Sequence, residues 1–138
     1  MSETKYGDFV KKLPFVRDGR LMAAGAKQLN GFGCHIIYAF AFETGITGMS
    51  HKPHVHKYDE AIYFIGSDPH KPGYLGAEVE FQIGKEREPH LFTEPTAVVI
   101  PKGVPHCPII THKIEQPFLV MAVSLTGERE DETKYIDD

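Results

Sequence analysis

Apolar and polar side chains alternate along short segments of the chain, and residues 77–83 show this pattern most clearly. Successive side chains of a strand point to opposite faces, so the alternation predicts a strand with one apolar face. The other face of this strand carries Glu78, Glu80 and Gln82, and it lies either in solvent or along the wall of a cavity.

Similar segments follow one another from residue 31 onward, separated by Gly and Pro. Residues 32–42 are apolar on both faces, which predicts a strand that is buried on two sides. Further strands are predicted at residues 55–65, 90–93, 96–100, 104–113 and 118–125. Roughly seven or eight short strands at spacings of about ten residues, without a helical period, predict an all-β sandwich or small barrel.

The two ends of the chain depart from this pattern. Residues 1–30 predict an N-terminal arm that packs on the outside of the sheet or across a partner subunit, and residues 21–27 within it are compatible with a short helical turn. Residues 31–126 predict a single β domain, as the length of 138 residues allows. Residues 127–138 are rich in charged side chains and predict a solvated tail.

Composition narrows the class of protein. A net charge of -4 without a basic run argues against nucleic-acid binding. The longest apolar run, residues 36–42, is far shorter than the roughly 20 residues of a membrane span, and no secretory signal pattern is present. Because Cys34 and Cys107 show no CxxC spacing, we expect a cytoplasmic protein with two free thiols, and a single disulfide is the alternative.

Histidine is concentrated in this chain, with 8 residues of 138. Positions 54, 56 and 60 share parity, so one continuous strand would point His54, His56 and Glu60 to the same side. Two imidazoles and a carboxylate supply three ligands for a divalent transition metal. The alternatives are that the two histidines are surface residues, or that Glu60 orients an imidazole without touching the metal.

A second motif supplies a fourth ligand. Pro101 and Gly103 predict a tight turn, because Pro presets one backbone angle and Gly accepts the unusual one. His106 begins the strand that follows, and it reaches the same cavity if the two strands are neighbours. Alternation then points Cys107 away from the metal, as buried filler.

Two further residues are candidates for catalytic roles. His51 precedes the strand and is either a rim acid or base, an alternative ligand, or an exposed side chain. Tyr58 has the parity of His54, so it either faces the cavity and hydrogen-bonds a substrate or packs in the core.

The order and spacing of these residues resemble the two signature motifs of the cupin superfamily. The matching residues are Gly48, His54, His56, Glu60 and Gly66, followed by Pro101, Gly103 and His106. The second motif departs from the family pattern at Pro95, where a glycine is usual, and at Ile110, where an asparagine is common. The resemblance implies a double-stranded β-helix, or jelly roll, with His54, His56, Glu60 and His106 as ligands of one divalent ion of Fe, Mn, Ni, Zn, Co or Cu.

We therefore expect a metal-dependent enzyme that acts on a small polar organic molecule, with a dioxygenase-type reaction slightly preferred. An isomerase, lyase or decarboxylase that uses the metal as a Lewis acid is the alternative. A binding module without catalysis is a third hypothesis. The resemblance also implies a homodimer, because small cupins of this type are commonly dimers.

Overall fold

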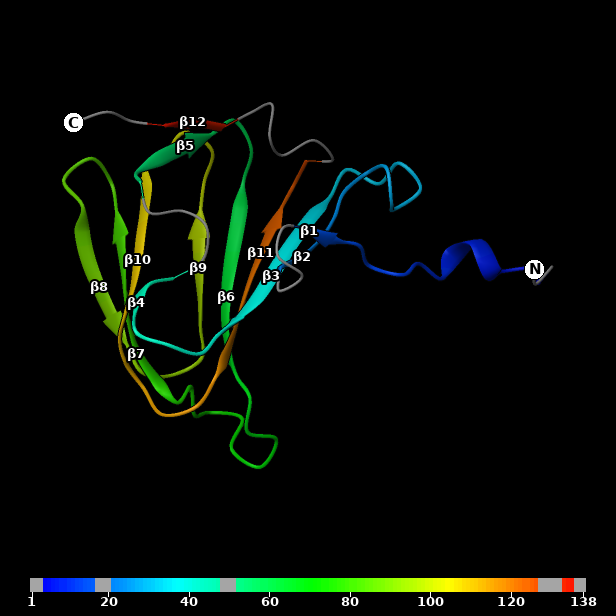
Figure 1. Cartoon of the computed structure of the whole chain (residues 1–138). Helices are drawn as coiled ribbons and strands as arrows, with labels where there is room; N and C mark the ends of the chain where they lie inside the picture. Colours follow the sequence, from blue (N-terminus) through cyan, green and yellow to red (C-terminus); the bar gives the residue numbers. More distant parts are fainter. Residues whose placement is uncertain (1–3, 17–20, 48–51, 127–132, 136–138) are drawn as a thin grey trace.

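The computed structural model of the chain describes residues 4–16, 21–47, 52–126 and 133–135 (Figure 1). Within these residues it contains twelve strands and one short 3-10 helix, Gly7–Phe9. This confirms the predicted all-β class. None of the helical residues in the described part forms a segment that is long and apolar enough to cross a membrane.

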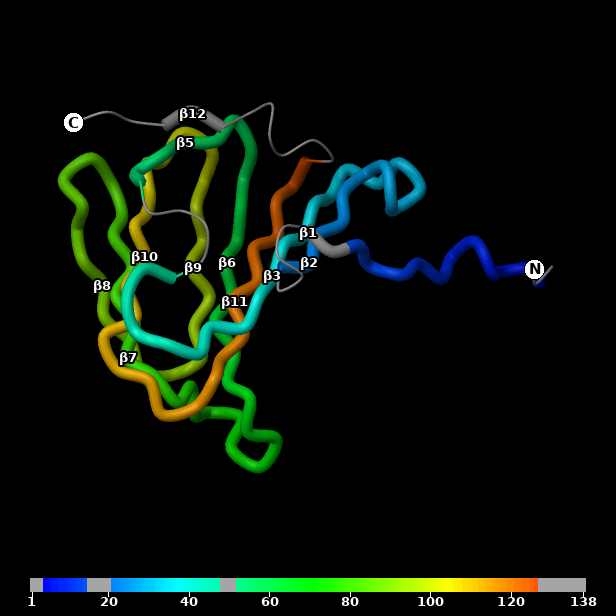
Figure 2. Tube along the Cα trace, viewed as in Figure 1, coloured from blue at the N-terminus to red at the C-terminus, as the bar shows by residue number. Residues whose placement is uncertain are grey.

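Two antiparallel sheets face each other and form a barrel (Figures 1 and 2). The first sheet contains, in spatial order, β1 (Phe15–Val16), β2 (Leu21–Ala24), β3 (His35–Ala41), β11 (Phe118–Ser124), β6 (Glu60–Gly66) and β9 (Thr96–Ile100). The second sheet contains β12 (Thr133–Tyr135), β5 (His54–His56), β10 (His106–Ile114), β7 (Ala77–Ile83) and β8 (Glu88–Phe92), with β4 (Gly45–Ile46) paired to β10.

The inner faces of the two sheets form one apolar core. Phe64 of the first sheet is 0% exposed and contacts three other phenylalanines, with ring centroids 6.0 Å from Phe81, 5.0 Å from Phe92 and 6.4 Å from Phe118. Aromatic pairs at these separations add to the free energy gained by burying their area. These four rings hold the two sheets together, and Phe81 also stacks on His106 with ring centroids 6.5 Å apart.

The polar face of β7 points outward, which decides between the two alternatives for that strand. Val79 and Phe81 are fully buried on the inner face. On the outer face Glu80 Oε1 lies 2.8 Å from His112 Nε2, and Gln82 Nε2 donates to Glu80 Oε2 at 2.7 Å. The hydrogen bond from His112, followed by that from Gln82, lowers the pKa of Glu80 below its ordinary value.

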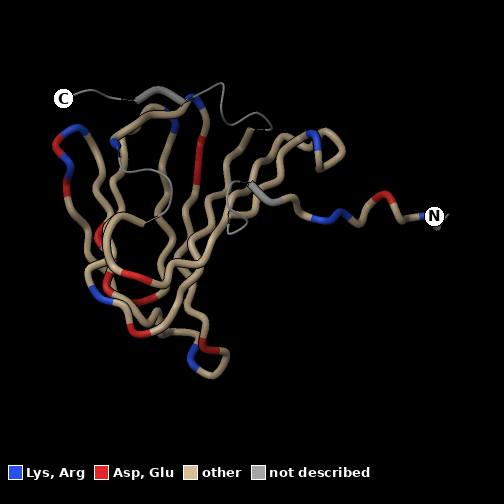
Figure 3. The backbone as a smooth tube through the Cα atoms, viewed as in Figure 1, with Lys and Arg blue, Asp and Glu red and all other residues tan. Residues whose placement is uncertain are grey.

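The outer face of the first sheet is apolar across four strands. The cross-strand register forms three rows on this face: Phe40, Leu119 and Ile65; then Tyr38, Met121, Tyr63 and Ala97; then Ile36, Val123, Ala61 and Val99. We call this surface the outer apolar face. It lies over β3 and β11, which carry no charged residue along their length (Figure 3).

Two segments differ from the sequence-based predictions. Residues 21–24 are strand β2 and not a helical turn, because pairing with β3 from Met22↔Tyr38 to Ala24↔Ile36 satisfies their backbone within the sheet. A turn follows only at residues 25–29, where Leu29 N donates to Gly25 O. In the tail, residues 133–135 form β12, which pairs with β5.

The predicted strand at residues 55–65 is divided between the two sheets. Residues 54–56 form β5 of the second sheet, and residues 60–66 form β6 of the first. The intervening bend is fixed by Asp59, whose carboxylate accepts from Lys102 N at 2.9 Å and whose carbonyl accepts from Leu125 N at 3.0 Å. The continuous strand assumed in the parity argument is therefore wrong, although the side chains still converge.

Candidate metal centre

Three of the predicted ligands meet in the interior of the barrel. Oε1 of Glu60 lies 3.6 Å from His56 Nε2 and 3.4 Å from His106 Nε2. All three side chains are buried, and each offers a donor atom within 4.8 Å of the donors of the other two. Two imidazole nitrogens and one carboxylate oxygen form a donor set that suits a divalent transition metal.

Backbone hydrogen bonds set the tautomer of two of the histidines. Nδ1 of His54 lies 2.9 Å from Lys52 O, and Nδ1 of His106 lies 2.9 Å from Val104 O. A carbonyl oxygen only accepts, so Nδ1 carries the proton in both rings, and Nε2 keeps its lone pair. An imidazole held in this tautomer is ready to bind a metal through Nε2.

The carboxylate of Glu60 is oriented in the same way by a residue of another strand. Ser124 Oγ, on β11, donates to Glu60 Oε2 at 2.8 Å, and both residues are buried. This bond leaves Oε1 directed toward His56 and His106. Nε2 of His106 is buried and makes no hydrogen bond, which fits a nitrogen that serves as a metal ligand.

The two motifs are adjacent because the turn between β9 and β10 lies against β5. Gly103 N donates to His56 O at 2.9 Å, and His106 is the register partner of His54. Gly103 has a φ of 83°, a left-handed conformation that favours glycine. The Pro-x-Gly motif thus provides the turn that the sequence predicts, and it carries His106 into the cluster.

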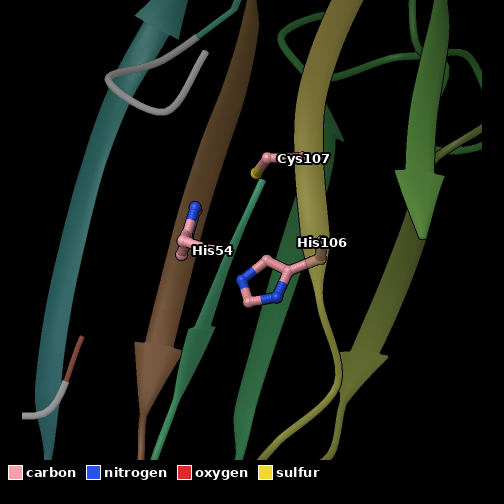
Figure 4. A group of neighbouring side chains, drawn as sticks. All are labelled: His54, His106 and Cys107. Atoms are coloured by element: carbon pink, nitrogen blue, oxygen red, sulfur yellow. The ribbon is translucent and has the colours of Figure 1, made fainter. Parts of the chain in front are cut away.

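His54 belongs to a second, overlapping group with His106 and Cys107 (Figure 4). The donor atoms of these three residues also lie within 4.8 Å of one another. The prediction that Cys107 points away is wrong, because Cys107 has a φ of 82° and the register with β7 shifts between His106 and Ile109. The bulge breaks strand alternation, so neighbouring side chains project to the same side of β10.

Of the two predicted catalytic residues, the structure describes Tyr58. Tyr58 is buried in the bend between β5 and β6, and its ring stacks on His56 with centroids 4.5 Å apart. His51 lies outside the described residues. Ser124 and Cys107 are the residues that the sequence argument did not place at the site, and neither is marked by a motif.

A cavity opens beside the cluster, with about 540 Å³ of empty space including its mouth. His54, Glu60 and His106 line one part of it. Apolar side chains from both sheets form much of the remaining wall, namely Leu21, Ile37, Ala39, Ile62, Ile109, Val120 and Ala122.

The sequence matches no known family model and no curated protein. Solved structures are similar in fold. Oxalate decarboxylase from Bacillus subtilis at pH 4.6 matches with a TM-score of 0.57 and 16% identity, over 91% of this chain and 30% of that chain. The polyketide cyclase RemF from Streptomyces resistomycificus matches with a TM-score of 0.56 and 15% identity, over 100% of this chain and 87% of that one.

A further structure of the same oxalate decarboxylase, described for its Mn(II) centers, matches with a TM-score of 0.56. This chain spans 30% of the length of that protein. Identities of 15–16% establish a shared fold and nothing finer. The likenesses confirm the double-stranded β-helix that the motifs predict.

Proposed function

The chain has the cupin fold, and we propose that it is a metal-dependent enzyme that acts on a small organic molecule held in the cavity. The observation that carries this proposal is the buried cluster of His56, Glu60 and His106, whose donor atoms converge next to that cavity. Buried, convergent titratable groups beside a cavity are characteristic of active sites.

We propose His54, His56, Glu60 and His106 as the ligands of one divalent transition metal. The Mn(II) centers of oxalate decarboxylase make manganese the first ion to test, followed by iron. A metal in this place would supply Lewis-acid chemistry and, for a redox-active ion, oxidation chemistry. Ser124 and the backbone carbonyls of residues 52 and 104 would hold the ligands in their binding orientation.

For the reaction we propose a dioxygenase type first, because a largely apolar wall accommodates both O2 and an organic molecule without leaving hydrogen bonds unmade. The second candidate is a decarboxylase, isomerase or lyase, and the names of the two structural neighbours favour it. In both cases Tyr58, stacked on His56, would act as a positioning residue for that ligand. His51 remains a predicted rim acid or base.

The reaction type is tested with protein loaded separately with Mn(II) and Fe(II). We expect O2 uptake with at least one substrate among catechols, thiols and keto acids, measured with an oxygen electrode and by product analysis. Glu60→Gln keeps the shape of the side chain but removes its charge, so this variant should lose turnover. Turnover that continues without O2 would contradict the dioxygenase reaction and favour a decarboxylase, isomerase or lyase. Binding without turnover of any compound would indicate a non-catalytic module.

We also propose that the protein is a homodimer in the cytoplasm. The dimer is supported by the outer apolar face, where Val99 is 76% exposed and Ile65 is 40% exposed. A contiguous exposed apolar surface of this kind marks an interaction site. Because the face carries no charge, a second copy related by twofold symmetry meets it without burying an unpaired ion.

Light scattering is expected to give twice the mass of one chain at micromolar concentration. Tyr63→Lys should produce the monomer, because it places a charge in the middle row of the outer apolar face. Leu91→Lys is the matched control, since Leu91 is 59% exposed on β8 of the other sheet. A wild-type protein that is monomeric under these conditions contradicts the dimer.

A further inference from the structure

The cavity wall and the metal cluster differ in chemistry, and this difference constrains the substrate. We propose that the substrate has a single chelating oxygen group with at most one negative charge, attached to an apolar body, and that dicarboxylates with a second carboxylate at the far end of the body are excluded. This inference rests on the proposed function, because it takes the cluster as a metal site. It goes further by assigning the class of molecule that the cavity accepts.

The apolar body is inferred from the side chains that surround the cavity. Ile37 and Val120 come from the first sheet, and Ile109 comes from the second. Ile62 and Ala122, also in the lining, are only 5% and 9% exposed. This part of the wall makes no hydrogen bond to a ligand, so it favours carbon over oxygen. Apart from the apolar wall and the proposed metal ligands, the lining residues are Tyr38, Cys107 and Thr47, and the Thr47 hydroxyl is already paired with that of Thr111. Each methylene group buried against the apolar wall should strengthen binding about fourfold.

The limit of one negative charge follows from the ionic groups at the cavity. Glu60 is the only Asp or Glu among the described residues that line it, and none of them is Lys or Arg. A divalent ion together with the Glu60 carboxylate leaves one positive charge. A monoanionic head group neutralises that charge, whereas a second carboxylate would be buried against Ile and Val without a counter-ion.

The position of the charged groups separates the two ends of the ligand. His54, Glu60 and His106 are the ionisable ligands at the cavity, while Ile37 and Val120 belong to the neighbouring strands β3 and β11. The chelating group therefore faces the cluster, and the body extends along the inner side of these two strands. The body contributes affinity, and the cluster fixes orientation.

The test compares three carboxylates on the Mn(II)-loaded full-length protein. Acetate has the chelating group without a body, hexanoate adds four methylene groups, and adipate carries a second carboxylate at the far end of the same six-carbon chain. Binding is measured by calorimetry and by the Mn(II) electron paramagnetic resonance spectrum. We expect hexanoate to bind at least about tenfold tighter than acetate, and adipate to bind at least tenfold more weakly than hexanoate.

Variants of the wall locate the effect. Ala122→Leu fills the space beside the cluster, so it should remove the advantage of hexanoate over acetate while metal content stays at the wild-type level. Ala26→Leu makes the same change in the turn after β2, away from the cavity, and should bind all three compounds as the wild type does. If Ala122→Leu does not fold, Val120→Ala tests the same wall by enlarging it, and octanoate should then gain affinity relative to hexanoate.

The possible failures are distinguishable. Wild-type protein that retains neither Mn(II) nor Fe(II) overturns the proposed function, and protein that retains only Fe(II) is tested with the same compounds in its Fe(II)-loaded form. Protein that retains Mn(II) but binds adipate as tightly as hexanoate, or acetate as tightly as hexanoate, overturns only the inference about the substrate. Metal-free protein serves as the reference, because the spectral change requires binding next to the ion.

Discussion

His106→Ala is expected to lose the metal almost completely. His106 contributes to both groups of potential ligands, the one with His56 and Glu60 and the one with His54 and Cys107. Its ring is 1% exposed and is held by the bond from Nδ1 to Val104 O, so no other side chain takes its place without moving the backbone. Outer partners of metal ligands are worth roughly 10–100-fold in affinity, and loss of a ligand should cost at least about 100-fold.

The measurement is metal per chain by elemental analysis of untagged protein, together with a circular dichroism spectrum that reports folding. His112→Ala is the matched control, because the side chain of His112 is 40% exposed and bonds Glu80 on the outer face of the second sheet. We expect this control to retain the wild-type metal content. Full metal content in His106→Ala would refute the ligand assignment.

Phe64→Ala is expected to destabilise the fold more than any single change on the surface. Phe64 is 0% exposed and lies between Phe92 and Phe118, so truncation leaves a cavity between the two sheets. Substitution of a buried Phe by Ala typically costs about 3–5 kcal/mol in the free energy of unfolding. For a domain whose total stability is about 5–15 kcal/mol, such a loss leaves much of the protein close to unfolding.

Chemical denaturation of the metal-free protein measures this cost without a contribution from metal binding. The control is Phe32→Ala, because Phe32 is 69% exposed and should change the free energy of unfolding by no more than about 0.5 kcal/mol. A loss below about 1 kcal/mol in Phe64→Ala would mean that the sheets repack around the missing ring, and it would contradict the description of the core.

The fold class was predictable from the sequence because its signal is local. The alternation of apolar and polar side chains along residues 77–83 predicts one buried face, whichever strand pairs with this one. The structure places Val79 and Phe81 on that buried face. Strand β2 was not predictable in this way. Residues 21–24 are Leu, Met and two Ala, which suit a helix as well as a strand, and pairing with β3 decides their conformation.

The site was predictable only where a motif fixed the geometry. His106 reaches the cluster because the turn at Gly103 carries it there. Parity placed His54 and His56 with Glu60, although the chain changes sheets at Asp59 between them. Ser124 touches Glu60 from a strand 64 positions away, and no local pattern marks such a contact.

Cys107 is a residue for which strand alternation predicts the wrong face. The register shift after His106 is a property of the pairing between β10 and β7, and the sequence of β10 alone does not display it. An argument from alternation therefore assigns this thiol to the wrong face. The cavity and its apolar wall were likewise not predictable from local sequence, because the side chains that line it come from both sheets.

The division of the donors between the two sheets has a consequence for how the protein acquires its metal. Glu60 belongs to the first sheet, whereas His56 and His106 belong to the second. An ion bound by all three would cross-link the sheets, so its release would require a donor of one sheet to move away from the donors of the other. Exchange would then be slowed by the packing that holds these side chains, and the bound ion would stabilise the contact between the two sheets.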